Sequence, residues 1–339
     1  MTPRDALESL FAGNDLTHGQ MTAVMTDIMT GVTTPLQTAA LVTALRYKGE
    51  SVTELAAAVQ VMRSLSAKVD TMGLQHVVDT CGTGGDGMHT FNISTTAAFV
   101  AAAAGACVAK HGGRSVSSSS GSADVLETLG IGLHSTTPER AQESLQRWGL
   151  GFMFAPHHHS AMKYAVGVRR ELGVRTLFNL LGPMTNPAGA PNQLLGVFAA
   201  HFTRRLAEVL RCLGTRHALV VHGSDGLDEI TLSGPTHMAE LRDGEVREFL
   251  FSPNEVGIQT APLNGLLVKD AMESRQLLLS VLDNQPGPAR DIVLLNAGAA
   301  LYVSGISRSL GDGVERARET LAAGAARQRL QDIVGWSQA

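Results

Sequence analysis

Two glycine-rich segments contain the residues best suited to chemistry in this sequence. The first, residues 79–87, reads D-T-C-G-T-G-G-D-G and is followed by N-I-S-T at 92–95. Glycines at the end of a strand let backbone N–H groups surround an anion, and the N-terminus of the next helix adds partial positive charge. The second, K-H-G-G-R at 110–114, runs into a series of serines that ends at Ser122. Cations, backbone donors and hydroxyls together suit a ligand that carries phosphate groups at two positions.

These segments allow two other interpretations. Gly82, Gly84 and Gly87 match the dinucleotide fingerprint G-x-G-x-x-G, which needs an acidic residue about 20 positions later to bind the ribose. No Asp or Glu occurs between Asp86 and Asp124, so the dinucleotide interpretation fails. The serines could instead form a flexible linker, although a linker seldom begins with K-H-G-G-R at a strand end.

A pair of acidic residues, Asp228 and Glu229, lies in the motif D-G-L-D-E at 225–229. Adjacent carboxylates on a loop hold Mg²⁺ next to substrate phosphates, whereas D-G alone is also a simple turn with solvated acids. Three consecutive histidines, 157–159, are a further candidate metal site. Neighbouring side chains point in different directions, and the i, i+4 spacing of paired ligands is missing. We therefore interpret the histidines as a ligand-contacting loop.

Short apolar runs predict the strands that position these loops, at 76–78, 107–109, 151–154, 194–197 and 218–221. They alternate with helical stretches, which is typical of an α/β fold with a mostly parallel central sheet. Residues 230–232, 237–241 and 246–250 predict antiparallel strands around a turn at Asp243-Gly244. Long helices return from about residue 266.

The first 70 residues predict helices only. Capping boxes open three apolar-periodic runs, and they are Thr17 with Gln20, Thr34 with Gln37, and Ser51 with Glu54. We predict a small helical domain over residues 1–70, completed by helices from about 160–185, and a larger α/β domain over 74–339.

The composition excludes several classes of protein. The 339 residues include 27 basic and 31 acidic side chains, a net charge of −4, so no global field would hold nucleic acid or an anionic membrane. The most apolar run falls short of the roughly 20 residues that span a bilayer. The three cysteines show no paired spacing. We expect a cytoplasmic protein that binds neither nucleic acid nor membrane.

Four motifs in this chain resemble the anthranilate phosphoribosyltransferase family of tryptophan biosynthesis. They are G-T-G-G-D-G with N-I-S-T at 82–95, K-H-G-G-R-S-V-S-S with G-S-A-D-V-L-E at 110–127, V-R-R-E-L-G-V-R-T with F-N-L-L-G-P at 168–183, and D-G-L-D-E at 225–229. The resemblance implies a fold like that of nucleoside phosphorylases and phosphoribosyltransferases. It also implies transfer of 5-phosphoribosyl from phosphoribosyl pyrophosphate (PRPP) to the anthranilate amine, by a Mg²⁺-dependent homodimer that pairs through its helical domain.

The resemblance also assigns residues, each by its match to a family motif. The PRPP site would comprise Gly82, Thr83, Gly85, Asp86, Thr90, Asn92, Ile93, Ser94, Thr95, Lys110, His111, Gly112, Gly113, Arg114, Ser115, Val116, Ser117, Ser118 and Ser122. The anthranilate site would comprise Gly82, His111, Gly113, Pro156, His159, Arg169 and Gly182. Two Mg²⁺ ions would be held by Ser94, Asp228 and Glu229. No residue is assigned as a general base.

One position departs from the family pattern. The family's second loop reads K-H-G-N-R, whereas position 113 here is Gly, so a relative with an altered aromatic-amine acceptor is one alternative. A pyrimidine nucleoside phosphorylase is a second alternative, because it also breaks a bond at an anomeric carbon. A non-catalytic nucleic-acid-binding relative is a third, although the net charge and the complete D-G-L-D-E motif argue against it.

Overall fold

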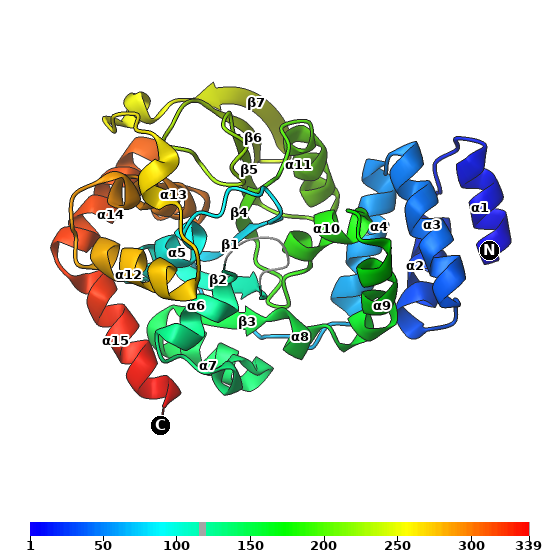
Figure 1. Ribbon diagram of the computed structural model, residues 1–339, viewed down its shortest axis with the longest axis horizontal. Helices are drawn as coiled ribbons and strands as arrows, with labels where there is room; N and C mark the ends of the chain where they lie inside the picture. Colours follow the sequence, from blue (N-terminus) through cyan, green and yellow to red (C-terminus); the bar gives the residue numbers. More distant parts are fainter. Residues whose placement is uncertain (115–119, 339) are drawn as a thin grey trace.

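The computed structural model describes residues 1–114 and 120–338, and its centre is one seven-stranded sheet (Figure 1). The strands are β1 Val77–Gly82, β2 Cys107–Gly112, β3 Leu150–Phe154, β4 Asn192–Gly196, β5 His217–Gly223, β6 Thr236–Arg242 and β7 Glu245–Phe251. Their order is β3-β2-β1-β4-β5-β6-β7. The first five in this order run parallel, and β6 and β7 form an antiparallel edge. The predicted α/β class with a mostly parallel sheet is confirmed.

Side chains of the central strands alternate between the two faces of the sheet, as the two-residue period of a strand requires. Leu194 and Leu219 pack in the core on one face, while their neighbours Leu195 and Val220 pack in the core on the other. The first core is shared with α5 Ile93–Ala103, α12 Ala271–Leu282, α13 Pro288–Val303, α14 Leu310–Ala322 and α15 Ala325–Ser337. The second is shared with α11 Phe202–Cys212, and a third, beneath β2 and β3, with α7 Pro138–Trp148.

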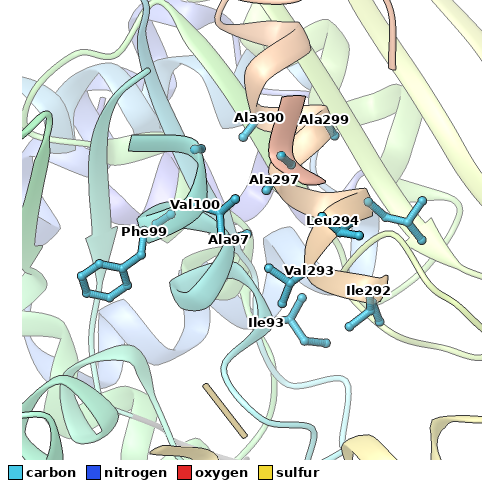
Figure 2. Close-up of a cluster of buried hydrophobic side chains, with 14 of the residues drawn as sticks. Ile93, Ala97, Phe99, Val100, Ile292, Val293, Leu294, Ala297, Ala299 and Ala300 are labelled. Atoms are coloured by element: carbon cyan, nitrogen blue, oxygen red, sulfur yellow. The ribbon is translucent and has the colours of Figure 1, made fainter. Parts of the chain in front are cut away.

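Helix α5 is fixed by its contact with α13. Figure 2 shows Ile93 and Ala97 of α5 facing Val293 and Ala297 of α13, and all four side chains are buried. Ile93 is the first residue of α5, so the hydrophobic core anchors the helix at the end that follows the glycine-rich loop. Burial of apolar side chains is the main favourable term in folding. The core therefore sets where the N-terminus of α5 lies.

The strand predicted at 230–232 is wrong, because these residues lie in the connection between β5 and β6. Ile230 N–H donates to Asn296 Oδ1 at 3.0 Å, and Asn296 Nδ2 donates to Ile230 O at 3.0 Å. A side-chain amide of α13 thus satisfies the backbone groups that a neighbouring strand would otherwise pair. The predicted turn is correct, since Asp243 and Gly244 join β6 to β7 with φ of 53° and 81°.

The helical region begins with α1 Pro3–Phe11, α2 His18–Thr30, α3 Pro35–Lys48 and α4 Val52–Ser64. All three predicted capping boxes are present, and a fourth, Thr2 with Asp5, opens α1. Helices α9 Lys163–Leu172 and α10 Leu177–Leu181 share the core of these four helices, and α10 lies between α4 and the sheet (Figure 1). No helix in the described part of the chain is long and apolar enough to cross a membrane.

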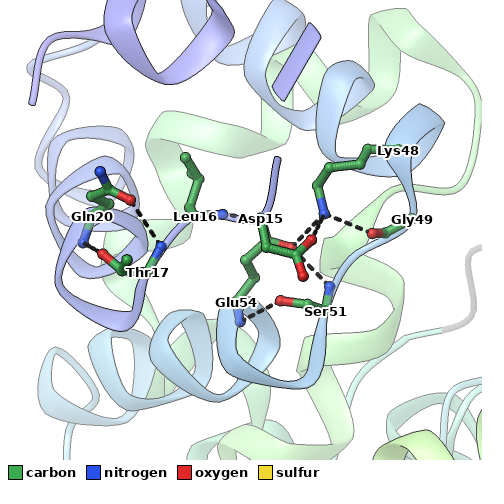
Figure 3. A network of polar contacts seen from close by, with 8 residues as sticks. All are labelled: Asp15, Leu16, Thr17, Gln20, Lys48, Gly49, Ser51 and Glu54. Atoms are coloured by element: carbon green, nitrogen blue, oxygen red, sulfur yellow. Dashed lines mark hydrogen bonds and ion pairs between the residues drawn. The ribbon is translucent and has the colours of Figure 1, made fainter. Parts of the chain in front are cut away.

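A polar network holds the N-terminal helices together (Figure 3). Glu54 is fully buried, and its Oε1 accepts from the N–H of Leu16 at 2.9 Å. Lys48 Nζ contacts Glu54 Oε2 at 2.9 Å and Asp15 Oδ1 at 2.5 Å. A buried carboxylate is stable when its charge is paired and its oxygens accept hydrogen bonds. The capping box that opens α4 therefore also fixes how α4 meets α3 and the start of α2.

Candidate active site

The residues predicted to bind the donor gather at the carboxyl ends of neighbouring strands. The glycine-rich loop follows β1, residues 113–114 follow β2, and the D-G-L-D-E loop follows β5. Parallel strands end at the same edge of a sheet, where α/β proteins commonly bind their ligands. The loop after β5 crosses the end of β4 to reach β1, because its carboxylates contact residues 84 and 94.

The glycine-rich loop offers unpaired backbone donors. Gly84, Gly85 and Gly87 have φ of 64°, 76° and 72°, a region in which side chains are strained. Within residues 1–114 and 120–338, the N–H groups of Gly85, Asp86 and Gly87 have no acceptor. Helix α5 starts behind this loop, and its N-cap residue Asn92 makes no side-chain capping bond. Unpaired N–H groups in front of a helix N-terminus form a site for an anion.

Two glycines let the acidic loop lie directly on the sheet. Gly82 of β1 pairs with Gly196 of β4. A Cβ on Gly196 would lie 1.6 Å from the carbonyl oxygen of Asp228, and a Cβ on Gly82 would lie 2.4 Å from Asp228 Oδ2. Neither position has room for a side chain. Because both are glycine, Asp228 Oδ2 accepts from the N–H of Gly84 at 2.7 Å.

The structure brings together the three residues predicted to bind metal. Glu229 Oε1 accepts from the N–H of Ser94 at 3.1 Å, at the start of α5. Burial, then the charges of Asp86 and Glu229, raise the pKa of Asp228 well above its ordinary value. Burial also raises the pKa of Glu229 to about 7, although the Lys110 ammonium opposes that rise. Buried carboxyl groups that lie close together are all ionised when a nearby cation compensates their negative charges.

Lys110 supplies part of that compensation from within the protein. Its side chain is 3% exposed, and its Nζ donates to the carbonyl oxygen of Thr80 and, at 3.3 Å, to Ser94 Oγ. The ammonium thus lies between β1 and the start of α5. Its charge acts on Glu229 and on the buried Asp79, whose pKa burial raises to about 6.

The donor atoms of this corner fit Mg²⁺. Mg²⁺ prefers oxygen ligands, and proteins commonly bind it through one or two carboxylates together with substrate phosphates. Within the described residues, no three His, Cys, Asp or Glu side chains are arranged to hold an ion by themselves. Ligand oxygens would therefore have to complete the coordination. Asp225 does not join this group, because its Oδ2 accepts from the hydroxyls of Thr231 and Ser233.

Asn92, the N-cap residue of α5, ties the start of that helix to two other segments. Its Oδ1 accepts from Ser120 Oγ at 3.0 Å and from Ser274 Oγ at 2.6 Å, and its N–H donates to Ser274 Oγ at 3.0 Å. Thr95 Oγ1 donates to Ser122 Oγ at 3.0 Å, at the first residue of α6 Ser122–Thr128. The start of α5 is thus bonded directly to the start of α6.

The remaining predicted donor residues differ in what they can offer. Arg114 forms ion pairs with Asp124 at 2.7 Å and Glu127 at 2.8 Å. Thr83 Oγ1 accepts a hydrogen bond from the N–H of Phe198. Thr90 forms an isolated β-bridge with residue 267. The side chain of Ile93 is buried in the core, so this residue could contact a ligand through its backbone alone. Gly112 ends β2. Ser115, Val116, Ser117 and Ser118 lie outside the described residues.

Two buried histidines meet on the acceptor side. The rings of His111, at the end of β2, and His159, after the short helix α8 Ala155–His158, lie 5.0 Å apart between centroids in an edge-on arrangement. The Nε2 atoms of both rings are buried and have no partner in the described part of the chain. Burial lowers the pKa of His159 to about 4, and it also lowers the pKa of His111 well below its ordinary value. Both rings are therefore neutral at pH 7.

The three consecutive histidines do not form a metal centre. His158 turns away from His159, and its ring nitrogens lie 2.9 Å from Ala67 O and 3.2 Å from Thr136 O. His157 Nδ1 lies 2.9 Å from the hydroxyl of Thr136. This divergence agrees with the interpretation of the segment as a loop from which one ring faces a ligand.

Arg169 is a half-buried cation without an anionic partner among residues 1–114 and 120–338. Burial lowers its pKa, and its guanidinium lies 5.6 Å from the ring centroid of Phe178 on α10. An uncompensated buried charge is costly, so the position suits a ligand carboxylate. Gly182 follows α10, and its backbone accepts a hydrogen bond from His111. Pro156 is in α8 beside His159, and a Cβ on Gly113 would meet open space.

Two family models match the chain. The helical bundle domain of a glycosyl transferase family matches residues 4–66, and the a/b domain of a glycosyl transferase family matches residues 74–327. The anthranilate phosphoribosyltransferases of Nitrosomonas europaea and Thiobacillus denitrificans are each 58% identical over 337 residues, which is 99% of this chain and 98% of each relative. The chain belongs to the anthranilate phosphoribosyltransferase family.

Solved anthranilate phosphoribosyltransferases share this fold. The enzyme from Thermus thermophilus is 42% identical, with a TM-score of 0.93 over 99% of this chain and 100% of that one. The enzyme from Saccharomyces cerevisiae in complex with PRPP and Mg is 24% identical, with a TM-score of 0.88 over 98% of both chains. The family membership predicted from four motifs is confirmed, and the nucleoside phosphorylase and nucleic-acid-binding alternatives are set aside.

Three residues at this anthranilate phosphoribosyltransferase site were not found from the sequence. Gly196 lies inside the strand predicted at 194–197 and ends β4, and a glycine in a strand is itself a signal of close backbone approach. Arg175 lies in the V-R-R-E-L-G-V-R-T motif, and it contacts the carbonyl oxygen of Gly85. Ser274 has no local signal, because its contact with Asn92 spans 182 residues.

Proposed function

We propose that this protein is an anthranilate phosphoribosyltransferase that uses two Mg²⁺ ions to transfer 5-phosphoribosyl from PRPP to anthranilate in tryptophan biosynthesis. The products are N-(5-phosphoribosyl)anthranilate and pyrophosphate. The observation that carries this proposal is the meeting of three unpaired N–H groups, at residues 85–87, with the buried carboxylates of Asp228 and Glu229. Donors for a polyphosphate and ligands for Mg²⁺ then lie side by side, as a PRPP complex requires.

In this proposal, some of the predicted PRPP residues bind phosphate, others bind the metal, and others hold the loops in place. The N–H groups of the glycine-rich loop bind phosphate oxygens in front of α5, and Ser94, Asp228 and Glu229 hold the metal. When bound, Mg²⁺ supplies charge neutralisation at the pyrophosphate. Asn92 accepts a hydrogen bond from Ser120 and Thr95 donates one to Ser122, and these two bonds hold the start of α5 against the start of α6.

The acceptor residues offer a matching arrangement for anthranilate. Arg169 is placed to pair with the carboxylate, because its half-buried guanidinium has no anionic partner in the described part of the chain and lies beside Phe178 on α10, the helix that Gly182 follows. The neutral rings of His111 and His159 present unpartnered nitrogens that accept from an amine N–H. Pro156, Gly182 and Gly113 supply backbone and open space around the aromatic ring.

The reaction is a displacement at the anomeric carbon with oxocarbenium character. The bond from C1 of ribose to the pyrophosphate oxygen breaks while the bond from C1 to the amine nitrogen forms. Negative charge grows on the leaving pyrophosphate, where the preorganised N–H groups stabilise it. The aromatic amine attacks as the neutral base, and its cationic adduct is strongly acidic. No general base is assigned, and holding the two substrates in contact supplies much of the rate enhancement.

We further propose a division into a helical domain, residues 1–70 completed by 160–185, and an α/β domain, residues 74–339. The helical domain would pair with a second copy of the chain. The support is a group of large apolar side chains exposed on it, with Phe11 at 71%, Leu36 at 80% and Tyr47 at 94%. We infer a cytoplasmic location from Cys81, Cys107 and Cys212, which all remain as free thiols.

The experiment that tests this function is a steady-state assay of the purified protein with PRPP, anthranilate and MgCl₂, read by anthranilate fluorescence. Asp228→Asn and Glu229→Gln should lower kcat by roughly 100-fold. Each removes a carboxylate ligand of the Mg²⁺ that neutralises the charge developing on the pyrophosphate in the transition state. The dissociation constant for anthranilate should change far less. Asp243→Asn, at the exposed β6–β7 turn, is the control and should match wild type. Unchanged activity and unchanged Mg²⁺ dependence in both site variants would overturn the assignment.

A further inference from the structure

Arg175 reaches from the helical side of the molecule to the glycine-rich loop. It lies between α9 and α10, two helices that share the core of the helical region. Its Nη2 donates to the carbonyl oxygen of Gly85, and its guanidinium lies 4.2 Å from the ring centroid of Phe198. Phe198 follows β4, and its N–H donates to Thr83 Oγ1 at 3.1 Å. The guanidinium thus binds Gly85 directly, and it is linked to Thr83 through Phe198.

The peptide between Gly85 and Asp86 needs such an anchor. Turning this peptide over rotates ψ of Gly85 and φ of Asp86. Gly85 has φ of 76° and no Cβ to restrict its ψ, so the peptide can turn over at little cost. A trans peptide points its C=O and its N–H in opposite directions. An N–H turned toward a phosphate binds it, whereas a carbonyl oxygen turned the same way repels it. Which group faces the ligand thus depends on what holds the Gly85 carbonyl.

Arg175 holds that carbonyl in the described structure. No other group in residues 1–114 and 120–338 donates to the Gly85 oxygen. The neighbouring tethers act on other atoms, since Asp228 binds the N–H of Gly84 and Asp86 Oδ1 accepts from the N–H of Met88. A planar guanidinium can donate at its edge while its face rests on an aromatic ring, which an ammonium cannot do in the same way.

We propose that Arg175 is a positioning residue for the phosphoribosyl donor. By holding the Gly85 carbonyl away from the ligand, it turns the N–H of Asp86 into the phosphate cradle. Because Arg175 belongs to the segment between α9 and α10, the shape of the cradle also depends on where the helical region lies. This role rests on the proposed function, because the cradle is useful if the ligand carries phosphate.

The test compares Arg175 with a matched arginine in the same motif. Arg170 is exposed on α9, five positions away, and has no partner in the described part of the chain. Arg175→Ala should raise KM for PRPP roughly tenfold and leave KM for anthranilate within about twofold, since it loses a hydrogen bond from a charged donor. Arg175→Lys and Phe198→Leu should each raise KM for PRPP by about threefold. Arg170→Ala should change neither constant.

A binding measurement separates this role from the proposed activity. Isothermal titration of each variant with PRPP and MgCl₂ should give a dissociation constant that rises in parallel with KM. Arg175 is exposed, so the melting temperature of Arg175→Ala should match wild type and exclude unfolding. Donor affinity within twofold of wild type, or an equal loss in Arg170→Ala, would overturn the role of Arg175. Wild-type protein that binds PRPP but transfers nothing to anthranilate would overturn the proposed function instead.

Discussion

In the proposed function, the donor side and the acceptor side of this site recognise their ligands in different ways. On the donor side, the groups free to bind are backbone N–H groups of residues 85–87, in a loop whose glycines allow the conformation. On the acceptor side they are side chains, Arg169, His111 and His159, which come from three separate segments. Backbone donors tolerate sequence change provided that the loop keeps its shape. Side-chain groups fix specificity, and a single substitution can remove one of them.

This difference has an energetic counterpart. The donor side concentrates negative charge, since burial and neighbouring acids raise the pKa of Asp228 and Glu229. The acceptor side holds a half-buried cation and two neutral rings, with the pKa of each lowered by burial. Both sides thus keep polar groups unsatisfied until their ligands arrive, a cost that binding energy offsets.

The largest loss of activity should come from a substitution that adds a methyl group on the donor side. Gly196→Ala places a Cβ 1.6 Å from the Asp228 carbonyl oxygen, so the acidic loop has to move. We expect kcat to fall by roughly 100-fold and overpacking to cost about 1–3 kcal/mol of stability. Gly335→Ala, on α15 with no atom near the new Cβ, is the control and should keep full activity. Wild-type turnover in Gly196→Ala would show that the position of the loop is not critical.

The next effect should fall on the acceptor side alone. Arg169→Met removes the cation that we pair with the anthranilate carboxylate, and a charged hydrogen-bonded pair contributes about 1.5–3 kcal/mol. KM for anthranilate should rise about 10- to 100-fold while KM for PRPP changes less than threefold. The melting temperature of the free protein should stay equal or rise, because a half-buried, uncompensated charge is gone. Parallel loss of both substrates would remove the distinction between the two sides.

A smaller effect concerns pH. Burial lowers the pKa of His159 from 6.5 to about 4, with the charges of His158 and Lys68 adding to the shift. Below about pH 6.5 His159 binds a proton in the unfolded chain but not in the folded protein. The free energy of unfolding therefore falls as the pH drops from about 6.5 toward 4. Between pH 7.5 and 5, wild type should lose about 2 kcal/mol more than His159→Gln, measured by urea unfolding. Equal losses in both proteins would mean that His159 is protonated when folded.

The smallest effect tests the one departure from the family pattern. Gly113→Asn restores the expected side chain, and its Cβ would meet open space, so the loop need not move. One polar contact contributes about 0.5–1.5 kcal/mol, which corresponds to a change of about two- to tenfold in KM for anthranilate. KM for PRPP should stay constant, because backbone groups make the phosphate contacts. An equal shift in both constants would show that the loop acts as a unit.

The two sides also differ in how far the sequence predicts them. The glycine-rich loop is one contiguous segment between a strand and a helix, so its conformation and its anion site can be predicted locally. The capping boxes are equally local, and all three are present. In contrast, the contact between His111 and His159 depends on the neighbouring ends of β2 and β3. Apart from the family resemblance, nothing in the sequence joins these histidines to Arg169.

The errors have physical causes of the same kind. The apolar run at 230–232 looks like a strand, but Asn296 pairs with its backbone from α13. D-G-L-D-E contains three acids, and the sequence does not say that Asp225 turns toward Thr231 and Ser233, while Asp228 faces the glycine-rich loop and Glu229 faces the start of α5. Nothing near Ser274 in the sequence marks it as a site residue, because its role depends on the packing of α12 against Asn92. Contacts of long sequence separation decide the first and the last case.

The measurement that most directly tests the central claim is an amide NMR titration of the protein labelled with ¹⁵N-glycine and ¹⁵N-aspartate. PRPP with MgCl₂ should shift the N–H signals of Gly85, Asp86 and Gly87 strongly, because phosphate oxygens accept from these groups, whereas anthranilate alone should leave them in place. If saturating PRPP leaves these three signals unmoved while other signals shift, the donor is not held by the backbone of the glycine-rich loop.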